Sequence, residues 1–316
     1  MNETIRWMME GPPWVEYRTR IDLLEQPEDA PEVIRARQAM LEDPQVKSLV
    51  AELAVWPGNP TTGVSQAVHP LHKLVFLADI GITTADPGVE EIINRILAHR
   101  SPEGVFTVAS GNSWKLCDFP SVLYALVKMG MEEEPQVRKM IDYMTGFSFE
   151  NGWPCVMSRE LDWFVKPDAD DDPCPIVNVI ALKTLAILPE WRNSQAARDG
   201  AFTLLDLWEK RRKRRPNLFG MGIRFSQLKA PFVWYDILHV LDVLTQFSFI
   251  QGDARLVEMI NVVGEKADSD LRFTVESVLN GWEEWEFGQE RDPSRWLTFL
   301  VHRIYKRAGL ALESHR

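Results

Sequence analysis

The sequence predicts an all-α protein folded as an (α/α)6 toroid, a ring of six helical hairpins, and three observations carry that prediction. Apolar helical stretches recur along the chain at intervals of roughly 50 to 60 residues. Between them lie stretches with one apolar stripe and one charged face, the pattern of a helix with one side in water. No segment alternates apolar and polar residues with period two for long enough to predict a sheet.

The buried helix of each hairpin is predicted from an apolar stretch with small or β-branched residues on most of its sides. These stretches begin near Trp14, Pro70, Phe119, Pro175, Trp234 and Ser294. The amphipathic partner helices fill the gaps between them. They begin at Val89, Pro135, Ala196 and Ala254. Short Gly or Asp turns with an aromatic residue, such as ENGW ending at Trp153, stop several of these helices.

A hairpin with one buried helix cannot cover its apolar faces alone, but six hairpins can cover one another by closing into a ring. We therefore expect one domain over residues 1–316, with the repeats clearest over 60–310. An open helical solenoid of the same hairpins is the competing arrangement, and it would need capping repeats that are not obvious in the sequence.

Composition and charge exclude several classes of protein. The 316 residues are 45% hydrophobic and 26% charged, as in a globular protein with a sizeable core. The 35 Lys and Arg against 46 Asp and Glu give 35 − 46 = −11, which argues against nucleic acid as a partner. No apolar run is long enough to span a membrane and no signal-peptide pattern is present, so we expect a soluble cytoplasmic protein. Its three cysteines, Cys117, Cys155 and Cys174, are expected to be reduced thiols.

In a ring of this kind the first turns of the buried helices face the same mouth, so chemistry is expected there. Titratable and aromatic side chains dominate these first turns. The residues expected to contact a substrate are Arg18, Lys166, Trp234, Tyr235 and Asp236. Arg18 and Lys166 are candidate contacts for a diphosphate, with an ordinary salt bridge as the alternative role of each.

The densest group of carboxylates precedes the helix expected from Pro175. Asp168, Asp170, Asp171 and Asp172 occupy four of five consecutive positions and repel one another, so we expect some of them to be paired, metal-bound or, if buried, protonated. An acidic loop whose last Asp caps the next helix is the alternative. Cys174 follows two residues later, and an Asp and a Cys at that spacing can bind one metal ion.

A histidine in the next buried helix completes a candidate zinc site. His239 lies one turn into the stretch that begins at Trp234, three residues after Asp236 and on nearly the same face. An open catalytic zinc site has three protein ligands, and Asp172, Cys174 and His239 would supply them.

These elements resemble the toroid superfamily of protein prenyltransferase β-subunits, hopene cyclases and other class II terpene cyclases. In the prenyltransferases, zinc is held by the Asp and Cys of a D-x-C element and by the His of a D-x-x-H element. This chain has Asp172-Pro173-Cys174 and Asp236-Ile237-Leu238-His239. The resemblance implies Zn²⁺ on Asp172, Cys174 and His239, a thiol activated beside an allylic diphosphate, and Mg²⁺ if a diphosphate is bound.

A second motif resembles the class II terpene cyclases, which carry D-x-D-D before an apolar helix. PDADD, ending at Asp171, has that pattern. The resemblance implies that Asp170 protonates an alkene or epoxide, that Asp168 and Asp171 support it, and that aromatic rings stabilise the carbocation. The 12 Trp suit such a cavity and suit an apolar core equally.

The sequence also differs from the prenyltransferases, and other functions stay open. The family has aromatic residues just after the zinc Cys and one turn further, where this chain has Pro175 and Asn178. We expect a zinc-dependent isoprenoid enzyme of the prenyltransferase type with a central apolar cavity. The alternatives are cyclisation by Asp170, a non-catalytic toroid that binds a lipid or a protein, and glycan cleavage by paired carboxylates. A protein partner or a second copy of the chain is compatible with each of them.

Overall fold

The described part of the structure is all-helical, which confirms the predicted all-α class. The computed structural model describes residues 3–58, 65–108, 114–156, 172–213 and 220–311. Within these ranges the backbone forms helices joined by turns, and β-pairing is limited to isolated bridges such as Pro154 with Pro173. None of the helices in these ranges has the length and apolar character needed to cross a bilayer.

The chain divides into two compact units. The central unit comprises residues 49–222, and the terminal unit comprises residues 1–48 together with 223–316.

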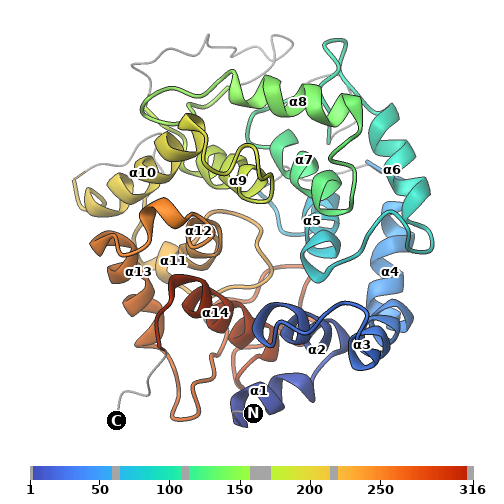
Figure 1. Cartoon of the computed structure of the whole chain (residues 1–316), viewed down its shortest axis with the longest axis vertical. Coiled ribbons are helices and arrows are strands. Elements are labelled where there is room, and N and C mark those ends of the chain that lie inside the picture. The colour runs from blue at the N-terminus through green and yellow to red at the C-terminus, as the bar shows by residue number, and fades with distance from the viewer. Residues whose placement is uncertain (1–2, 59–64, 109–113, 157–171, 214–219, 312–316) are drawn as a thin grey trace. The chain divides into compact units, whose positions relative to one another are not determined.

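The described part of the central unit contains three pairs of consecutive helices. Its helices are α5 (Pro70–Ile80), α6 (Val89–Ala98), α7 (Phe119–Lys128), α8 (Pro135–Thr145), α9 (Pro175–Ala186) and α10 (Gln195–Glu209). Helices α5, α7 and α9 lie side by side, α8 packs on α7, and α10 packs on α9 (Figure 1). Every residue of α9 is buried, as its apolar sequence on all sides predicts.

The starts of the buried helices in the central unit follow from proline. Pro70, Pro120 and Pro175 stand in the first turns of α5, α7 and α9, where the missing N–H costs no hydrogen bond. Helix α5 also has a side-chain cap, because His69 Nδ1 accepts a hydrogen bond from Leu71 N at 3.1 Å. Predicted and observed starts therefore agree closely in this unit.

The terminal unit combines the two ends of the chain. Its elements are α1 (Glu3–Met9), α2 (Pro13–Arg18), the π-helical turn η1 (Thr19–Leu23), α3 (Pro31–Glu42), α11 (Ile223–Ser226), α12 (Ile237–Leu244), the 3₁₀ turn η3 (Ser248–Ile250), α13 (Ala254–Gly264) and α14 (Arg295–Ala308). Helix α12 packs against α13 and α14, and α1 and α2 also contact α14. Helix α12 begins at Ile237 instead of near Trp234, because Asp236 caps it.

The sequence analysis did not predict α1, α3, α4 (Pro44–Leu53) and α11. The longest of these are α3 and α4, and α4 crosses the border between the units. Both begin at a proline, and Asp43 Oδ1 accepts a hydrogen bond from Gln45 N at 2.8 Å before α4. These start signals were present in the sequence, but both helices lie outside residues 60–310, where the repeats are clearest.

Several tryptophans fill the core. Trp14, Trp153, Trp282 and Trp296 are fully buried. In the terminal unit the ring centroid of Trp285 lies 5.1 Å from that of Trp14 and 5.4 Å from that of Trp282. Large rings in such contacts contribute packing energy to a core, so the high tryptophan content has a structural role at these positions.

Candidate functional site

The start of α9 holds Cys174 between two backbone contacts. Cys174 N donates to Trp153 O at 2.8 Å, and Asn178 N donates to Cys174 O at 3.1 Å. Asn178 Nδ2 donates to Cys174 O as well, at 2.9 Å. Cys174 is buried and Asp172, two residues earlier, is exposed. The backbone of Cys174 is therefore fixed, with a carboxylate at the solvent-facing side of the same loop.

Asn178 joins this helix start to the ENGW turn. Its Oδ1 accepts from Trp153 N at 3.1 Å, and its Nδ2 also donates to Trp153 O at 2.9 Å. Gly152, the residue before Trp153, has φ +84°. A Cβ at that position would clash with Asn178 Oδ1. A side chain larger than hydrogen is thus excluded at Gly152. Asn178 therefore fixes the backbone at Cys174.

All three cysteines of the chain gather next to this loop. Leu116 N donates to Val156 O at 2.8 Å, and an antiparallel bridge joins Pro154 to Pro173. The thiol of Cys174 donates a hydrogen bond to the sulfur of Cys155, and this bond, against the opposing effect of burial, lowers the pKa of Cys155 to about 7. The same bond, together with burial, raises the pKa of Cys174 well above its ordinary value.

Cys117 is engaged differently. Its thiol donates to Asp118 Oδ1 at 3.2 Å, and burial together with the Asp118 charge raises the pKa of Cys117 well above its ordinary value. Burial raises the pKa of Asp118 to about 6, against the lowering effect of the Cys117 hydrogen bond. The group therefore contains one exposed thiol, Cys155, beside two thiols that hold their protons.

The start of α12 carries the second candidate element. Asp236 Oδ1 accepts from His239 N at 2.9 Å and so caps the helix. Burial raises the pKa of Asp236 to about 7, while the backbone hydrogen bond from His239 opposes that shift. Trp234 and Tyr235 are half-buried just before it, and the Tyr235 ring lies 5.8 Å from that of Phe225.

The imidazole of His239 has a defined orientation. Its Nδ1 lies 2.7 Å from Trp234 O, and its ring stacks on Phe232 with centroids 4.9 Å apart. A carbonyl oxygen only accepts hydrogen bonds, so Nδ1 carries the proton and Nε2 carries the lone pair in the neutral ring. This tautomer is the one that zinc-binding histidines use when a carbonyl orients them.

The remaining predicted residues divide between the two units and the undescribed segment. Asp172 and Cys174 belong to the central unit, whereas Asp236 and His239 belong to the terminal unit. Arg18 is also in the terminal unit, where its Nη2 lies 2.7 Å from Asp22 Oδ1 in an ion pair. The predicted substrate contact Lys166 and the carboxylates of the D-x-D-D motif lie outside the described residues. These carboxylates are Asp168, Asp170 and Asp171.

Sequence reasoning missed two residues of the candidate site, Cys155 and Asn178. Cys155 shares no helix with Cys174, and the two meet only because the Pro154 to Pro173 bridge brings their segments together. Asn178 could have been recognised in the sequence, because it is a polar residue in the otherwise apolar first turn of α9. A buried Asn needs hydrogen-bond partners, and that need predicts a neighbouring turn with open backbone groups.

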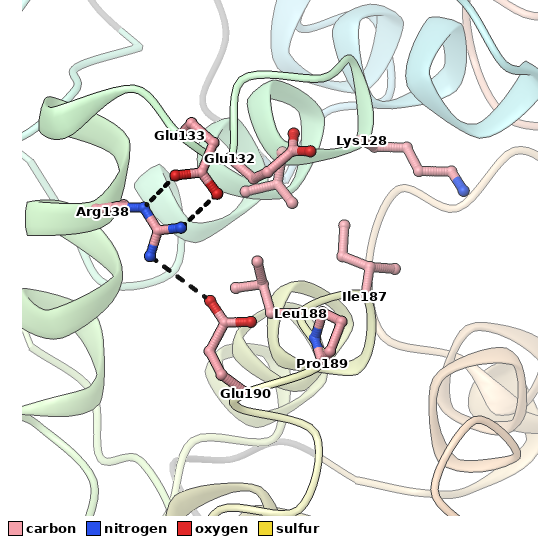
Figure 2. A pocket seen from close by; sticks show the side chains of 9 residues that line it. Lys128, Glu132, Glu133, Arg138, Ile187, Leu188, Pro189 and Glu190 are labelled. Atoms are coloured by element: carbon pink, nitrogen blue, oxygen red, sulfur yellow. Dashed lines mark hydrogen bonds and ion pairs between the residues drawn. The ribbon is translucent and has the colours of Figure 1, made fainter.

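A separate pocket opens at the opposite ends of α7 and α9. It has a volume of about 470 Å³ and is lined in part by Lys128, Glu132, Glu133, Arg138 and Glu190. Figure 2 shows Arg138 between two carboxylates, with Nη2 2.5 Å from Glu133 Oε1 and Nη1 3.8 Å from Glu190 Oε1. The lining has neither a cysteine nor a histidine, and the pocket is remote along both helices from Asp118 and Cys174.

Within the described ranges, no three His, Cys, Asp or Glu side chains are grouped so as to hold a metal ion. Cys174 and His239 each have a local environment suited to a ligand, and each belongs to a different unit. Comparison of the sequence with models of known protein families and with curated proteins finds no match to either.

Proposed function

We propose that this chain is a zinc-dependent isoprenoid enzyme of the prenyltransferase type, built as an (α/α)6 toroid and acting in the cytoplasm on an allylic diphosphate. Asp172, Cys174 and His239 would hold the zinc. The proposal is supported by the position of both motif elements, since each opens a helix whose residues are all buried. Three free cysteines agree with a reducing compartment.

The orientation of His239 is the observation that carries this proposal. A histidine ligand needs one nitrogen with a lone pair and an anchor on the other nitrogen. Trp234 O anchors Nδ1 at 2.7 Å, and the stacked Phe232 ring fixes the plane of the imidazole. Asp236 holds the backbone of the same turn through its bond to His239 N. The ring plane is therefore fixed and Nδ1 is bound to the carbonyl oxygen, so Nε2 is the atom that would coordinate zinc.

Cys174 fits the second ligand position. Its backbone is fixed by Trp153 O and Asn178, so the residue is held at the start of α9. The thiol holds its proton in the metal-free protein, because its pKa is raised by the hydrogen bond to Cys155 and by burial. A coordinating metal replaces such a proton, and zinc binding here should release it to solvent.

When bound, zinc would lower the pKa of a substrate thiol and hold it as a thiolate nucleophile. Residues of the chain would orient the two ligands His239 and Cys174. Trp234 O and Asp236 fix His239, and Asn178 fixes Cys174. The half-buried rings of Trp234 and Tyr235 offer apolar surface for an isoprenoid tail beside the D-x-x-H element.

The test is the zinc content of the purified full-length protein by elemental analysis. We expect about one zinc ion per chain in the wild type, and strong loss in Cys174→Ala and in His239→Ala. Cys117→Ala is the matched control, because it removes a thiol from the same region that lies outside the proposed ligand set. It should keep its zinc.

Turnover of an allylic isoprenoid diphosphate with a thiol acceptor would extend the same test. A wild type that binds no zinc after reconstitution would overturn the proposal. Cyclisation of a polyprene that survives without metal but is lost in Asp170→Asn would replace it with the acid-initiated reaction.

A further inference from the structure

Two of the three cysteines form a pair with unequal access to solvent. The thiol of Cys174 donates its hydrogen bond to the sulfur of Cys155. Cys155 is exposed and Cys174 is buried. A reagent in solution therefore reaches Cys155 first, and Cys174 lies next to the sulfur that has reacted.

The backbone holds the pair together from both sides. Pro154 and Pro173, the residues just before the two cysteines, form the antiparallel bridge. Cys174 N donates to Trp153 O at 2.8 Å, and Leu116 N donates to Val156 O at 2.8 Å. These bonds fix the backbone on each side of Cys155 and hold its segment next to that of Cys174.

Cys117 lies near the pair but has its own partner. Its thiol donates to Asp118 Oδ1 at 3.2 Å instead of to a sulfur. It therefore provides an internal control, being a thiol of the same neighbourhood without the sulfur hydrogen bond.

We propose that Cys155 and Cys174 are a redox-active pair that closes to an intramolecular disulfide by exchange with a small disulfide such as oxidised glutathione. The inference goes beyond the proposed function and does not require zinc. It assigns a modification site to the loop that opens α9.

The exchange takes two steps. Cys155, as the thiolate, attacks one sulfur of the small disulfide, forms a mixed disulfide and releases one small thiolate. Cys174 then gives up its proton to solvent and attacks the Cys155 sulfur, which releases the second small thiolate. Two protein thiols have been oxidised, one disulfide has been reduced to two thiols, and excess dithiol reverses the sequence.

The experiment treats the metal-free full-length protein with oxidised glutathione and maps the cysteines by mass spectrometry. We expect wild type to lose two of its three free thiols and to yield a crosslink between the peptides of Cys155 and Cys174. Cys117→Ser should give the same crosslink. Cys155→Ser should give none, and dithiothreitol should restore all thiols in the wild type.

The variant Cys174→Ser gives a positive signal even though it cannot form the crosslink. With no second thiol to resolve it, the mixed disulfide should accumulate on Cys155 as a stable glutathione adduct. A crosslink that includes Cys117, or a persistent adduct on Cys155 in the wild type, would overturn the proposal. Far-ultraviolet circular dichroism on each variant checks that the helices remain folded.

A zinc arm separates this inference from the proposed function. If Cys174 is a zinc ligand, loading with zinc before oxidation should slow the crosslink, because the sulfur is already bound. This consequence alone rests on the proposed function. A crosslink that forms at the same rate with and without zinc would leave the thiol pair established and would count against the zinc site.

Discussion

The two units both bury charged side chains between helices, but they neutralise them in different ways. In the central unit Asp79 of α5, Tyr124 of α7 and Lys183 of α9 form a network with a single cation. In the terminal unit a larger network joins α2, η1, α12 and α14. Its members are Arg18, Asp22, Asp242, Arg303 and Arg307.

The central network has one cation for one carboxylate. Lys183 Nζ lies 2.9 Å from Asp79 Oδ2, and the side chains are only 4% and 8% exposed. Tyr124 OH donates to the other carboxylate oxygen at 2.5 Å, and Lys183 Nζ lies 4.3 Å from the Tyr124 ring centroid. The three groups satisfy one another, and removal of any one leaves the others short of a partner.

The terminal network has several cations for two carboxylates. Arg303 reaches Asp242 at 2.8 Å and Asp22 at 3.2 Å, and Arg307 also reaches Asp242, at 2.9 Å. Arg18 adds a second cation to Asp22 at 2.7 Å. Each carboxylate therefore keeps a partner when one arginine is lost.

The buried ion pairs and the titratable groups of the candidate site lie at different places along the helices. Both networks are neutralised within the helical packing, well after the first turns of α5, α9, α12 and α14. The groups with pKa values near neutrality lie instead at or beside the starts of helices, at Asp118, Cys155 and Asp236. Burial of an ion pair is thus no sign of a site here, and titratable groups at helix starts are the better guide.

The largest effect is expected from Lys183→Met. It leaves Asp79 buried without a counter-charge, and we expect the free energy of unfolding to fall by about 3 to 5 kcal/mol. The double variant Asp79→Asn with Lys183→Met removes both charges and keeps an acceptor for Tyr124, so it should recover most of that loss. Urea unfolding followed by circular dichroism measures both. If the unfolding free energy of Lys183→Met alone lies within about 1 kcal/mol of the wild-type value, Lys183 is not the cation that neutralises Asp79.

Acid should act on the terminal network through Asp22. Burial alone would raise its pKa, but the charges of Arg18, Arg303 and Arg307 outweigh burial and lower it from 3.8 to about 2. The lowered pKa of Asp22 stabilises the folded state fully at pH values above the pKa of Asp22 in the unfolded chain. This stabilisation disappears as the pH falls from about 4 to 2, a loss of about 2 kcal/mol. Unfolding free energies across that range should fall less steeply in Asp22→Asn, and equal slopes would argue against the shift.

Tyr124→Phe tests the neutral member of the central network. It removes the hydroxyl hydrogen bond to Asp79 but leaves Lys183 in place, so we expect a loss of about 1.5 kcal/mol. Because the phenyl ring still lies beside the ammonium group, its contact with Lys183 should survive. Chemical denaturation is the measurement, and Tyr305→Phe, which removes a hydrogen bond to the backbone oxygen of Ile260 at 3.1 Å, is the matched control with a smaller expected effect.

The smallest effect is expected from Arg307→Gln. Its side chain is 28% exposed, and Asp242 keeps Arg303 when Arg307 is lost. We expect a change below about 1 kcal/mol in unfolding free energy. A cost as large as that of Lys183→Met would show that the terminal network is not redundant and would remove the distinction between the units.

Most of the helical framework could be predicted from the sequence. The all-round apolar stretch from Pro175 predicted a helix buried on every side, and α9 is one. The amphipathic stretches from Val89, Pro135 and Ala254 form helices at the expected starts. Periodicity is a local property, so it survives in the sequence without knowledge of the neighbours. Lys183 within α9 shows the limit, because its partner lies on another helix.

The candidate site was predictable only in part. The motif spacing pointed to Asp172, Cys174, Asp236 and His239, and the cap on α12 agrees with the preference of Asp for that position. His239 is oriented by its hydrogen bond to Trp234 O, and Asn178 donates a hydrogen bond to Cys174 O. Both bonds depend on backbone oxygens whose positions are set by turns. No residue pattern records where such an oxygen will lie.

The sequence by itself determined the helical class and the starts of the buried helices, because helix periodicity, proline and capping residues act within a few positions of the chain. Only the tertiary structure decided which side chains meet. The segments of Cys155 and Cys174 are neighbours because a bridge pairs Pro154 with Pro173, and the charge of Asp79 is balanced because Lys183 reaches it from another helix. Contacts between distant segments depend on the packing of the whole unit, and that packing is a collective property of many side chains.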